Sequence, residues 1–423
     1  MNTANEHQLY VVMNGRVIGD VQRTGKRRMR LRYSDSASHS FTPLSVSMPG
    51  PAGRYREPVL DSWLSGLLPD RPETLRQWRR QFGISDETDA YSLVRHVGED
   101  LAGAAQFVRP ERLEVVLKKS GRLSPLESSR IAEMLRRAKA DLPISDIDNG
   151  QGKFSLAGAQ AKIALHRSDD GWNDPSGSVP STHIIKPAIP GMPDQDLVEA
   201  VTMRTASNLD LGVARCSIEE FADERAIVVE RYDRAQRSDG RWTRVHQEDM
   251  CQALGLWPSR KYESQGGPGA FALADLIRRT SRQPSEDVQR LARALIFNWL
   301  VCGTDAHARN YSLLLSGPTV RLAPLYDLNS HLAYSDGSGN SLSMSIGGVF
   351  RAERITVDSW VGVAPALGIE PDWLRHEIDR QQASLMDAMA AAAASADIAR
   401  YASPAVHRLL SNTENWIQRR VRT

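Results

Sequence analysis

The sequence has few features of secreted, membrane-spanning or metal-bound proteins. Only three of its 423 residues are cysteine, and Cys216, Cys251 and Cys302 lack the paired spacing of a zinc site or a disulfide framework. No apolar run is long enough to cross a bilayer. The first residues also lack the charged segment followed by an apolar segment that is typical of a signal peptide. We therefore expect a cytoplasmic protein without a membrane partner.

Excess charge and a Walker motif are also missing. The net charge is +2, so the chain is not globally cationic, and 41% hydrophobic with 25% charged residues is ordinary globular usage. The pattern G-x-x-x-x-G-K-[ST] is absent, which disfavours a P-loop NTPase. One basic run could touch nucleic acid, but a solvated strand face explains it better: Arg23, Lys26, Arg27, Arg28, Arg30 and Arg32.

The most informative segment reads Gly-Thr-Asp-Ala-His-Ala-Arg-Asn over residues 303–310. Asp305 and Asn310 have the five-residue spacing of a protein-kinase catalytic loop, in which the Asp accepts the acceptor hydroxyl's proton and the Asn holds magnesium. His307 could offset charge on the transferred phosphoryl group, and Asp327 supplies a second oxygen ligand for Mg²⁺. The pattern predicts phosphoryl transfer, whereas the motif in isolation is more often a capped loop.

The surrounding sequence favours the catalytic interpretation. Apolar residues between 291 and 300 have helical spacing, and Ser285 is the expected cap with acidic residues following it. After Asn310, a β-like stretch, a Gly317-Pro318 turn and a second β-like stretch lead to Asp327. Helix, catalytic loop, hairpin and metal-binding Asp is the order of a kinase C-lobe.

Three upstream segments fit a nucleotide site. Lys186 ends the strand-like His-Ile-Ile-Lys and is the candidate nucleotide lysine, with Glu199 on a helix from 196 to 208 as its possible partner. Residues 226–233 predict a buried strand that continues into the hinge between the two lobes. The small, glycine-containing segment 154–162 is a candidate phosphate-covering loop between strands.

Seven collinear blocks resemble the HipA family of serine/threonine kinase toxins across nearly the whole chain. They cover residues 155–162, 182–186, 229–233, 247–252, 261–269, 304–310 and 326–327. The resemblance implies an ATP- and Mg²⁺-dependent kinase with Asp305 and His307 as catalytic residues and Asn310 and Asp327 at the metal. It implies nucleotide contacts from Ala157, Gly158, Ala159, Gln160, Ala161, Lys162, Lys186, Glu230, Arg231, Tyr232, His307, Ala308, Arg309, Asn310, Tyr326 and Asp327.

The resemblance also implies regulation and partners. The serine that matches Ser155 is autophosphorylated in the family, which expels the phosphate loop and inactivates the enzyme. Family toxins associate with a helix-turn-helix antitoxin dimer on operator DNA, mainly through the antitoxin. The best-known relatives phosphorylate an aminoacyl-tRNA synthetase, of the glutamyl type, which halts translation and leads to growth arrest or persistence.

Three positions depart from the family pattern. Arg309 replaces a lysine and keeps its charge, Tyr232 replaces a phenylalanine and keeps a ring, and Ala161 replaces a glutamate of the phosphate loop. Because Ala161 lacks the carboxylate, the family's loop gating does not transfer directly to this chain, whereas the expected chemistry does. Two alternatives stay open, a small-molecule or lipid kinase and a non-catalytic corepressor bound to its antitoxin on DNA.

The expected fold is α+β and bilobal, similar to protein and phosphatidylinositol kinases. We expect a β-rich N-terminal subdomain over 1–109, because Asn14-Gly15 is a strong hairpin signal and new β-like sequence begins at Pro110. An N-lobe with phosphate loop, nucleotide lysine and hinge follows over 110–234. A mostly helical C-lobe with the catalytic loop and metal Asp covers 235–423.

Overall fold

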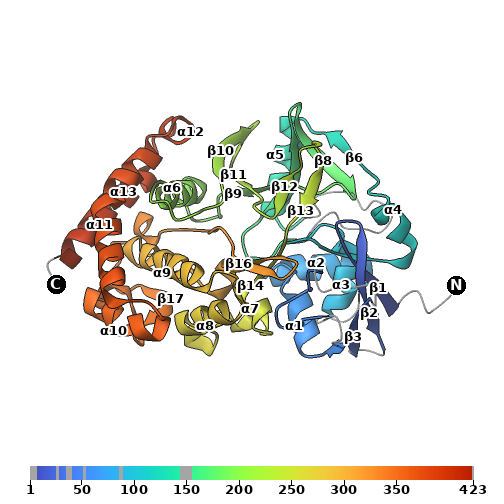
Figure 1. Ribbon diagram of the computed structural model, residues 1–423. Coiled ribbons are helices and arrows are strands. Elements are labelled where there is room, and N and C mark those ends of the chain that lie inside the picture. Colours follow the sequence, from blue (N-terminus) through green and yellow to red (C-terminus); the bar gives the residue numbers. More distant parts are fainter. Residues whose placement is uncertain are drawn as a thin grey trace.

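A computed structural model describes residues 7–24, 28–34, 41–50, 54–84, 89–142 and 155–421. Lys26, Arg27 and Phe154 of the predicted segments lie outside these residues. Figure 1 shows the blue N-terminal unit and the red C-terminal helices at opposite ends, with a green sheet region between them. Within the described residues, no helix is long and apolar enough to cross a membrane.

The N-terminal unit is an antiparallel sheet covered by short helices. The predicted hairpin is confirmed, because Asn14 and Gly15 both have positive φ, at 50° and 83°, as a two-residue turn requires. Trp63 and Phe107 are fully buried in the core of this unit. The strands, in the order β4-β3-β2-β1-β5, are β1 Gln8–Met13, β2 Arg16–Arg23, β3 Met29–Tyr33, β4 Arg54–Arg56 and β5 Ala105–Val108, and the helices are α1 Val59–Ser65, α2 Pro72–Phe82 and α3 Ala90–Val97.

The arginines of the basic run that the structure describes are partly paired within this unit. Arg23 lies 2.6 Å from Asp89, and Arg32 lies 3.3 Å from Asp20 on the neighbouring strand. Their charge is therefore partly neutralised by the unit itself, in line with a solvated strand face.

The segment that follows β5 is helical, not β-like as the sequence suggested. It forms a 3₁₀ turn over Pro110–Arg112 and α4 over Leu113–Leu117. Pro110 explains the difference, because proline at the first position of a helical turn has a suitable φ and lacks an N–H that would go unpaired there.

The central sheet is built from antiparallel strands between two helices. Val228 faces α5, whereas Ile227 and Val229 face α6, which is the two-residue alternation of a strand buried on both sides. Its order is β10-β11-β9-β7-β8-β6, with β6 Gly121–Pro125, β7 Ile163–Ser168, β8 Gly171–Gly177, β9 His183–Pro187, β10 Cys216–Phe221 and β11 Glu224–Glu230, and the helices are α5 Ser128–Lys139 and α6 Gln195–Asn208.

The remaining residues are mostly helical, as predicted, with small sheets that carry the catalytic loop. The long helix α9 begins at Pro284 with Gln283 as its cap, so the expected cap at Ser285 is wrong by two residues. Proline again occupies the first helical position. The strands are β12 Arg234–Gln236, β13 Trp242–Arg244, β14 His246–Asp249, β15 Ser312–Ser316, β16 Thr319–Leu322, β17 Ser341–Ile346 and β18 Val349–Arg351, and the helices are α7 Met250–Ala253, α8 Ala270–Thr280, α9 Pro284–Leu300, α10 Val357–Leu367, α11 Pro371–Ala393, α12 Ala396–Ala399 and α13 Pro404–Val421.

Buried polar groups join the N-terminal unit to the rest of the chain. The Glu248 carboxylate on β14 accepts hydrogen bonds from Val46 N at 2.8 Å and Trp63 Nε1 at 2.9 Å. Asp100 pairs with Arg234 at 3.0 Å beyond the end of β11. These contacts fix the N-terminal unit beside the site described next.

Candidate active site

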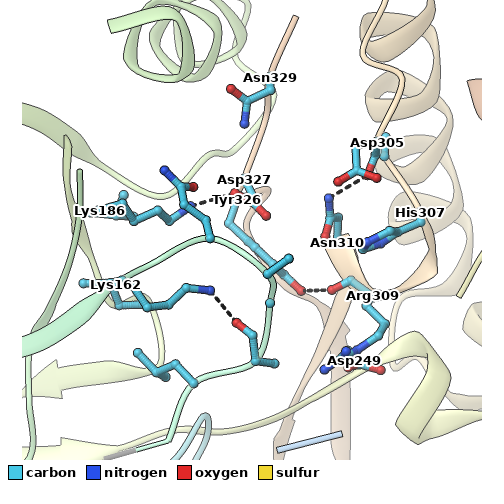
Figure 2. A pocket seen from close by; sticks show the side chains of 18 of the residues that line it. Lys162, Lys186, Asp249, Asp305, His307, Arg309, Asn310, Tyr326, Asp327 and Asn329 are labelled. Carbon is cyan, nitrogen blue, oxygen red and sulfur yellow. Dashed lines mark hydrogen bonds and ion pairs between the residues drawn. The ribbon is translucent and has the colours of Figure 1, made fainter. Parts of the chain in front are cut away.

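A cavity of about 520 Å³ is lined by residues from all three regions of the chain. Every predicted nucleotide contact lines it except Ala161 and Ala308. Ala161 packs partly against the core under α5, and Ala308 is fully buried. Figure 2 shows Lys162 and Lys186 entering the cavity from one side, where Lys186 reaches Asp327 and Lys162 reaches a loop carbonyl. Asp305, His307 and Asn310 lie on the opposite side.

Lys186 is the centre of a buried ionic group. Its ammonium lies 2.7 Å from Oε1 of Glu199 on α6 and 2.6 Å from Oδ1 of Asp327. Burial alone would lower the pKa of Lys186, but the two carboxylates raise it above its ordinary value, so the lysine stays charged. The predicted partnership of Lys186 with Glu199 is present in the structure.

Asp327 is held in an unusual backbone conformation. Its φ is +57°, in the left-handed region that few residues other than glycine adopt, although aspartate tolerates it better than most. Burial disfavours its charge, yet the ammonium groups of Lys186 and Lys162 lower the pKa of Asp327 to about 2. The carboxylate is thus ionised at neutral pH.

The catalytic-loop residues follow α9 and are held by local hydrogen bonds. The backbone N–H of His307 donates to Asp305 O at 2.8 Å, and Asn310 Nδ2 donates to the same oxygen at 2.9 Å. The Asp305 side chain is exposed to solvent, whereas His307 is buried and burial lowers its pKa. Among the described residues, Nδ1 of His307 has no hydrogen-bond partner.

The phosphate-loop segment lies between the cavity and the N-terminal unit. Gly158 has φ +110°, which a residue with a side chain rarely adopts, and its carbonyl accepts from Asp70 N at 3.1 Å. Lys162 Nζ donates to Ala157 O at 2.6 Å. Burial, with the charge of Lys186 nearby, lowers the pKa of Lys162 to about 8. A strand, β7, follows the loop as predicted, but the preceding described element is α5.

Ser155 does not line the cavity. It is fully buried, and its hydroxyl donates to Leu67 O at 2.8 Å while its N–H donates to Asp100 O at 3.1 Å. Both contacts are with the N-terminal unit. The hydroxyl must therefore leave this position before it can meet a phosphoryl donor.

Two of the predicted nucleotide contacts have guanidinium groups that are already paired. Arg309 donates to Asp249 Oδ2 at 3.0 Å and to Gly66 O at 2.8 Å, and it also pairs with Asp70. Arg231 is buried against Asp233 at 2.8 Å. Their charged groups hold the fold around the cavity. The Arg231 N–H and the carbonyl groups of both arginines are also hydrogen-bonded within the protein.

The hinge side of the cavity is aromatic. Tyr232 and Tyr326 lie with ring centroids 5.7 Å apart and planes tilted by 32°. The Tyr326 hydroxyl donates to Arg309 O at 2.7 Å, which ties the segment before Asp327 to the catalytic loop. Glu230 ends β11 in register with His183 and borders the cavity at the end of the sheet.

Sequence reasoning missed several residues of the cavity wall. Asp70 belongs to the N-terminal unit, yet it pairs with Lys261 at 2.9 Å and with Arg309. Gln195 donates to both Glu199 and Asn329 at 3.2 Å. The Asp327-Leu-Asn329 spacing could have suggested Asn329 as a further oxygen ligand, but no local signal distinguishes Asp70.

The donor set suits a magnesium ion that is shared with a nucleotide. Across the described residues, no three His, Cys, Asp or Glu side chains gather as a protein-only metal site. Asp327 and Asn310 supply hard oxygen atoms on the cavity wall, and Mg²⁺ is commonly bound by one or two protein oxygens together with substrate phosphates. These two residues would hold the ion, whose chemistry is to neutralise phosphate charge.

Comparisons with known proteins identify the family. A model of the HipA N-terminal domain matches residues 9–108, and a model of the HipA-like C-terminal domain matches residues 154–395. The putative kinase Y4mE of Sinorhizobium fredii is 34% identical over 391 residues, covering 90% of this chain and 91% of that protein. The serine/threonine-protein kinase toxin HipA of Shewanella oneidensis is 27% identical over 392 residues, covering 90% and 88%.

A solved structure agrees. The complex of the Shewanella oneidensis MR-1 toxin–antitoxin system HipA, HipB and its operator DNA matches with a TM-score of 0.81 and 26% identity, covering 97% of both chains. Relatives that span nearly the whole chain are thus kinases by name. This chain belongs to the HipA family, as its sequence blocks indicated.

Proposed function

We propose that the chain is an ATP- and Mg²⁺-dependent serine/threonine protein kinase. The supporting observation is that Asp305, Asn310 and Asp327 line one cavity with Lys186, which lies more than 100 residues before them in the sequence. Phosphoryl transfer needs a positioned donor, a base for the acceptor and charge neutralisation, and these residue types supply all three.

The proposed roles follow from the position of each group. Lys186, fixed by Glu199, binds the phosphates of ATP, and Asn310 with Asp327 holds the metal. Asp305 is exposed at the opposite side of the cavity and accepts the proton of the acceptor hydroxyl. The oxygen of that hydroxyl then bonds to the γ-phosphorus of ATP, and ADP leaves. His307 lines the cavity beside Asp305, where its ring would offset charge on the transferred group.

We assign the chain a bilobal kinase-like organisation with the N-terminal unit as an extra subdomain. The divisions are 1–109, 110–234 and 235–423. This assignment is supported by the cavity, which receives residues from the central sheet, the loop after β11 and the catalytic loop after α9. A nucleotide between the sheet and the helical region would contact the hinge with its base and Lys186 with its phosphates.

We further propose a toxin role, regulated by autophosphorylation at Ser155. The relative of known structure is a toxin bound to HipB and operator DNA, which supports a helix-turn-helix antitoxin dimer as partner, with DNA contacted mainly through it. An aminoacyl-tRNA synthetase, of the glutamyl type, is the acceptor we propose to test first. Its phosphorylation would halt translation and promote growth arrest.

The test is label transfer from γ-labelled ATP and Mg²⁺ into a nucleotide-depleted bacterial lysate. We expect one or a few proteins to acquire label on serine or threonine. Asp305→Asn should reduce transfer by about 10²-fold or more, the scale of a lost general base, while nucleotide binding stays close to wild type. Asp275→Asn, which alters an exposed aspartate on α8, is the matched control. Unchanged turnover in Asp305→Asn would end the assignment.

A further inference from the structure

The base proposed for the acceptor hydroxyl is itself bound by a tyrosine from another segment. The Tyr262 hydroxyl donates a hydrogen bond of 2.8 Å to Oδ1 of Asp305. Tyr262 lies between the 3₁₀ turns Pro258–Arg260 and Glu263–Gln265, far from the catalytic loop in sequence.

The segment that carries Tyr262 is fixed on both sides. Lys261 pairs with Asp70 at 2.9 Å, and its carbonyl accepts from Ala308 N at 3.2 Å. On the other side, Glu263 accepts from Ser345 N at 2.6 Å and from Ser345 Oγ at 2.9 Å. These contacts fix the backbone on both sides of Tyr262 and so hold the tyrosine beside the catalytic loop.

The ring is also placed by its neighbours. Tyr262 meets the His307 ring edge to face, with centroids 5.1 Å apart and an angle of 77° between planes. Burial, with the hydrogen bond and negative charge of Asp305, raises the pKa of Tyr262 well above its ordinary value. The phenol therefore keeps its proton at neutral pH and acts as the donor.

Asp305 needs such a partner because its side chain is exposed. A short carboxylate in water samples several rotamers, and a base must be held within hydrogen-bond reach of the proton that it accepts. A donor on Oδ1 fixes the carboxylate and leaves its second oxygen for the acceptor hydroxyl.

We infer that Tyr262 is a positioning residue, which holds Asp305 in the orientation that accepts the proton of a serine or threonine hydroxyl. This inference rests on the proposed kinase function. The position of Asp305 then depends on segment 261–263, which is held by the contacts of Lys261 with Asp70 and of Glu263 with Ser345.

A competing interpretation makes the opposite prediction. The phenol could occupy the place of the acceptor hydroxyl and block Asp305 until an acceptor displaces it. Loss of the hydroxyl would then raise the rate of transfer. A positioning hydrogen bond, by contrast, lowers the rate when it is lost.

The experiment compares Tyr262→Phe and Tyr262→Leu with the wild type in the lysate-labelling assay. Phe keeps the ring against His307 and removes only the hydroxyl, whereas Leu removes both. We expect Tyr262→Phe to lower the rate at saturating ATP about tenfold or more, with the KM for ATP within about twofold of wild type. Tyr262→Leu should add little to that loss.

Controls separate this inference from the proposed function. Tyr401→Phe removes a partly exposed hydroxyl that accepts from Arg400 and should leave both constants unchanged. Thermal unfolding shows whether Tyr262→Phe is folded. A wild-type rate in Tyr262→Phe, a higher rate, or a loss seen only in Tyr262→Leu overturns the inference while leaving the kinase intact. A wild-type chain that transfers no label overturns the function itself.

Discussion

Lys186 Nζ lies 2.7 Å from Oε1 of Glu199, and the Glu199 side chain is fully buried. A lysine that binds phosphates must keep its charge inside the protein, and a buried carboxylate must have a cation beside it. Each residue therefore stabilises the ionised form of the other. This pair connects the strand β9 to helix α6 at the wall of the cavity.

We predict that Lys186→Met destabilises the protein as well as abolishing transfer. Removal of the ammonium leaves the Glu199 charge buried without its main partner, which costs about 3–5 kcal/mol in comparable cases. The double variant Lys186→Met/Glu199→Gln removes both charges and should recover most of the lost Tm without recovering activity. Thermal unfolding and label transfer measure the two effects. Equal Tm values for the single and double variants would contradict the pairing.

We predict that Asp70, although it belongs to the N-terminal unit, affects transfer. It pairs with Arg309, the residue before Asn310, and with Lys261, and those two cations lower the pKa of Asp70 although burial opposes its charge. Asp70→Asn should lower the transfer rate roughly tenfold, because about 1 Å of displacement at a site costs on that scale or more. Glu73→Gln on α2, an exposed residue of the same unit, should have no effect.

We predict that a charge at Ser155 releases the phosphate loop. Ser155 is fully buried, so Ser155→Asp places a carboxylate where its solvation is lost, and departure of the loop relieves that cost. Nucleotide affinity should fall, as measured by calorimetric titration. Ser155→Asn, similar in size but neutral, should bind more tightly than Ser155→Asp. Ser155→Ala loses one hydrogen bond, worth about 1 kcal/mol, and should stay active.

Mass spectrometry completes that test. After incubation with ATP and Mg²⁺, the wild-type chain should carry phosphate at Ser155. The Asp305→Asn variant, incubated without wild-type protein, should not. Active protein without phosphate at that position would refute the regulatory role while leaving the kinase proposal in place.

We predict a pH-dependent contribution to stability from Glu248. Burial raises the pKa of this carboxyl to about 7 despite three favourable hydrogen bonds. Between about pH 4.5 and 7 the folded state binds more protons here than the unfolded state, so stability from this residue falls as pH rises. The shift corresponds to a change on the order of 3 kcal/mol.

The measurement is the difference in Tm between wild type and Glu248→Gln from pH 5 to 8. The difference is needed because burial, partial for His183 and complete for His246, lowers the pKa of each histidine to about 4, so their contribution to stability rises with pH. We expect the advantage of wild type over the variant to shrink toward pH 8. A constant difference would show that Glu248 is ionised throughout.

Local sequence determined much of this molecule. The Asn14-Gly15 turn, the α6 and α9 helices and the hairpin after Asn310 follow from turn chemistry and periodicity, and the structure has them where they were predicted within a few residues. Errors fell at Pro110 and Ser285, where proline starts a helical turn and overrides weaker local signals. Element boundaries depend on such single residues.

Local sequence also indicated which residue types could perform phosphoryl transfer, because the spacing of Asp305, Asn310 and Asp327 is a local property. The pairing of Arg309 with Asp70 and Asp249, and the hydrogen bond from Tyr262 to Asp305, depend on the folded arrangement. Those contacts join segments far apart in the chain, and their free energy comes from burying charges and hydroxyls beside specific partners. No local pattern encodes such a partner, so folding alone brings each pair together.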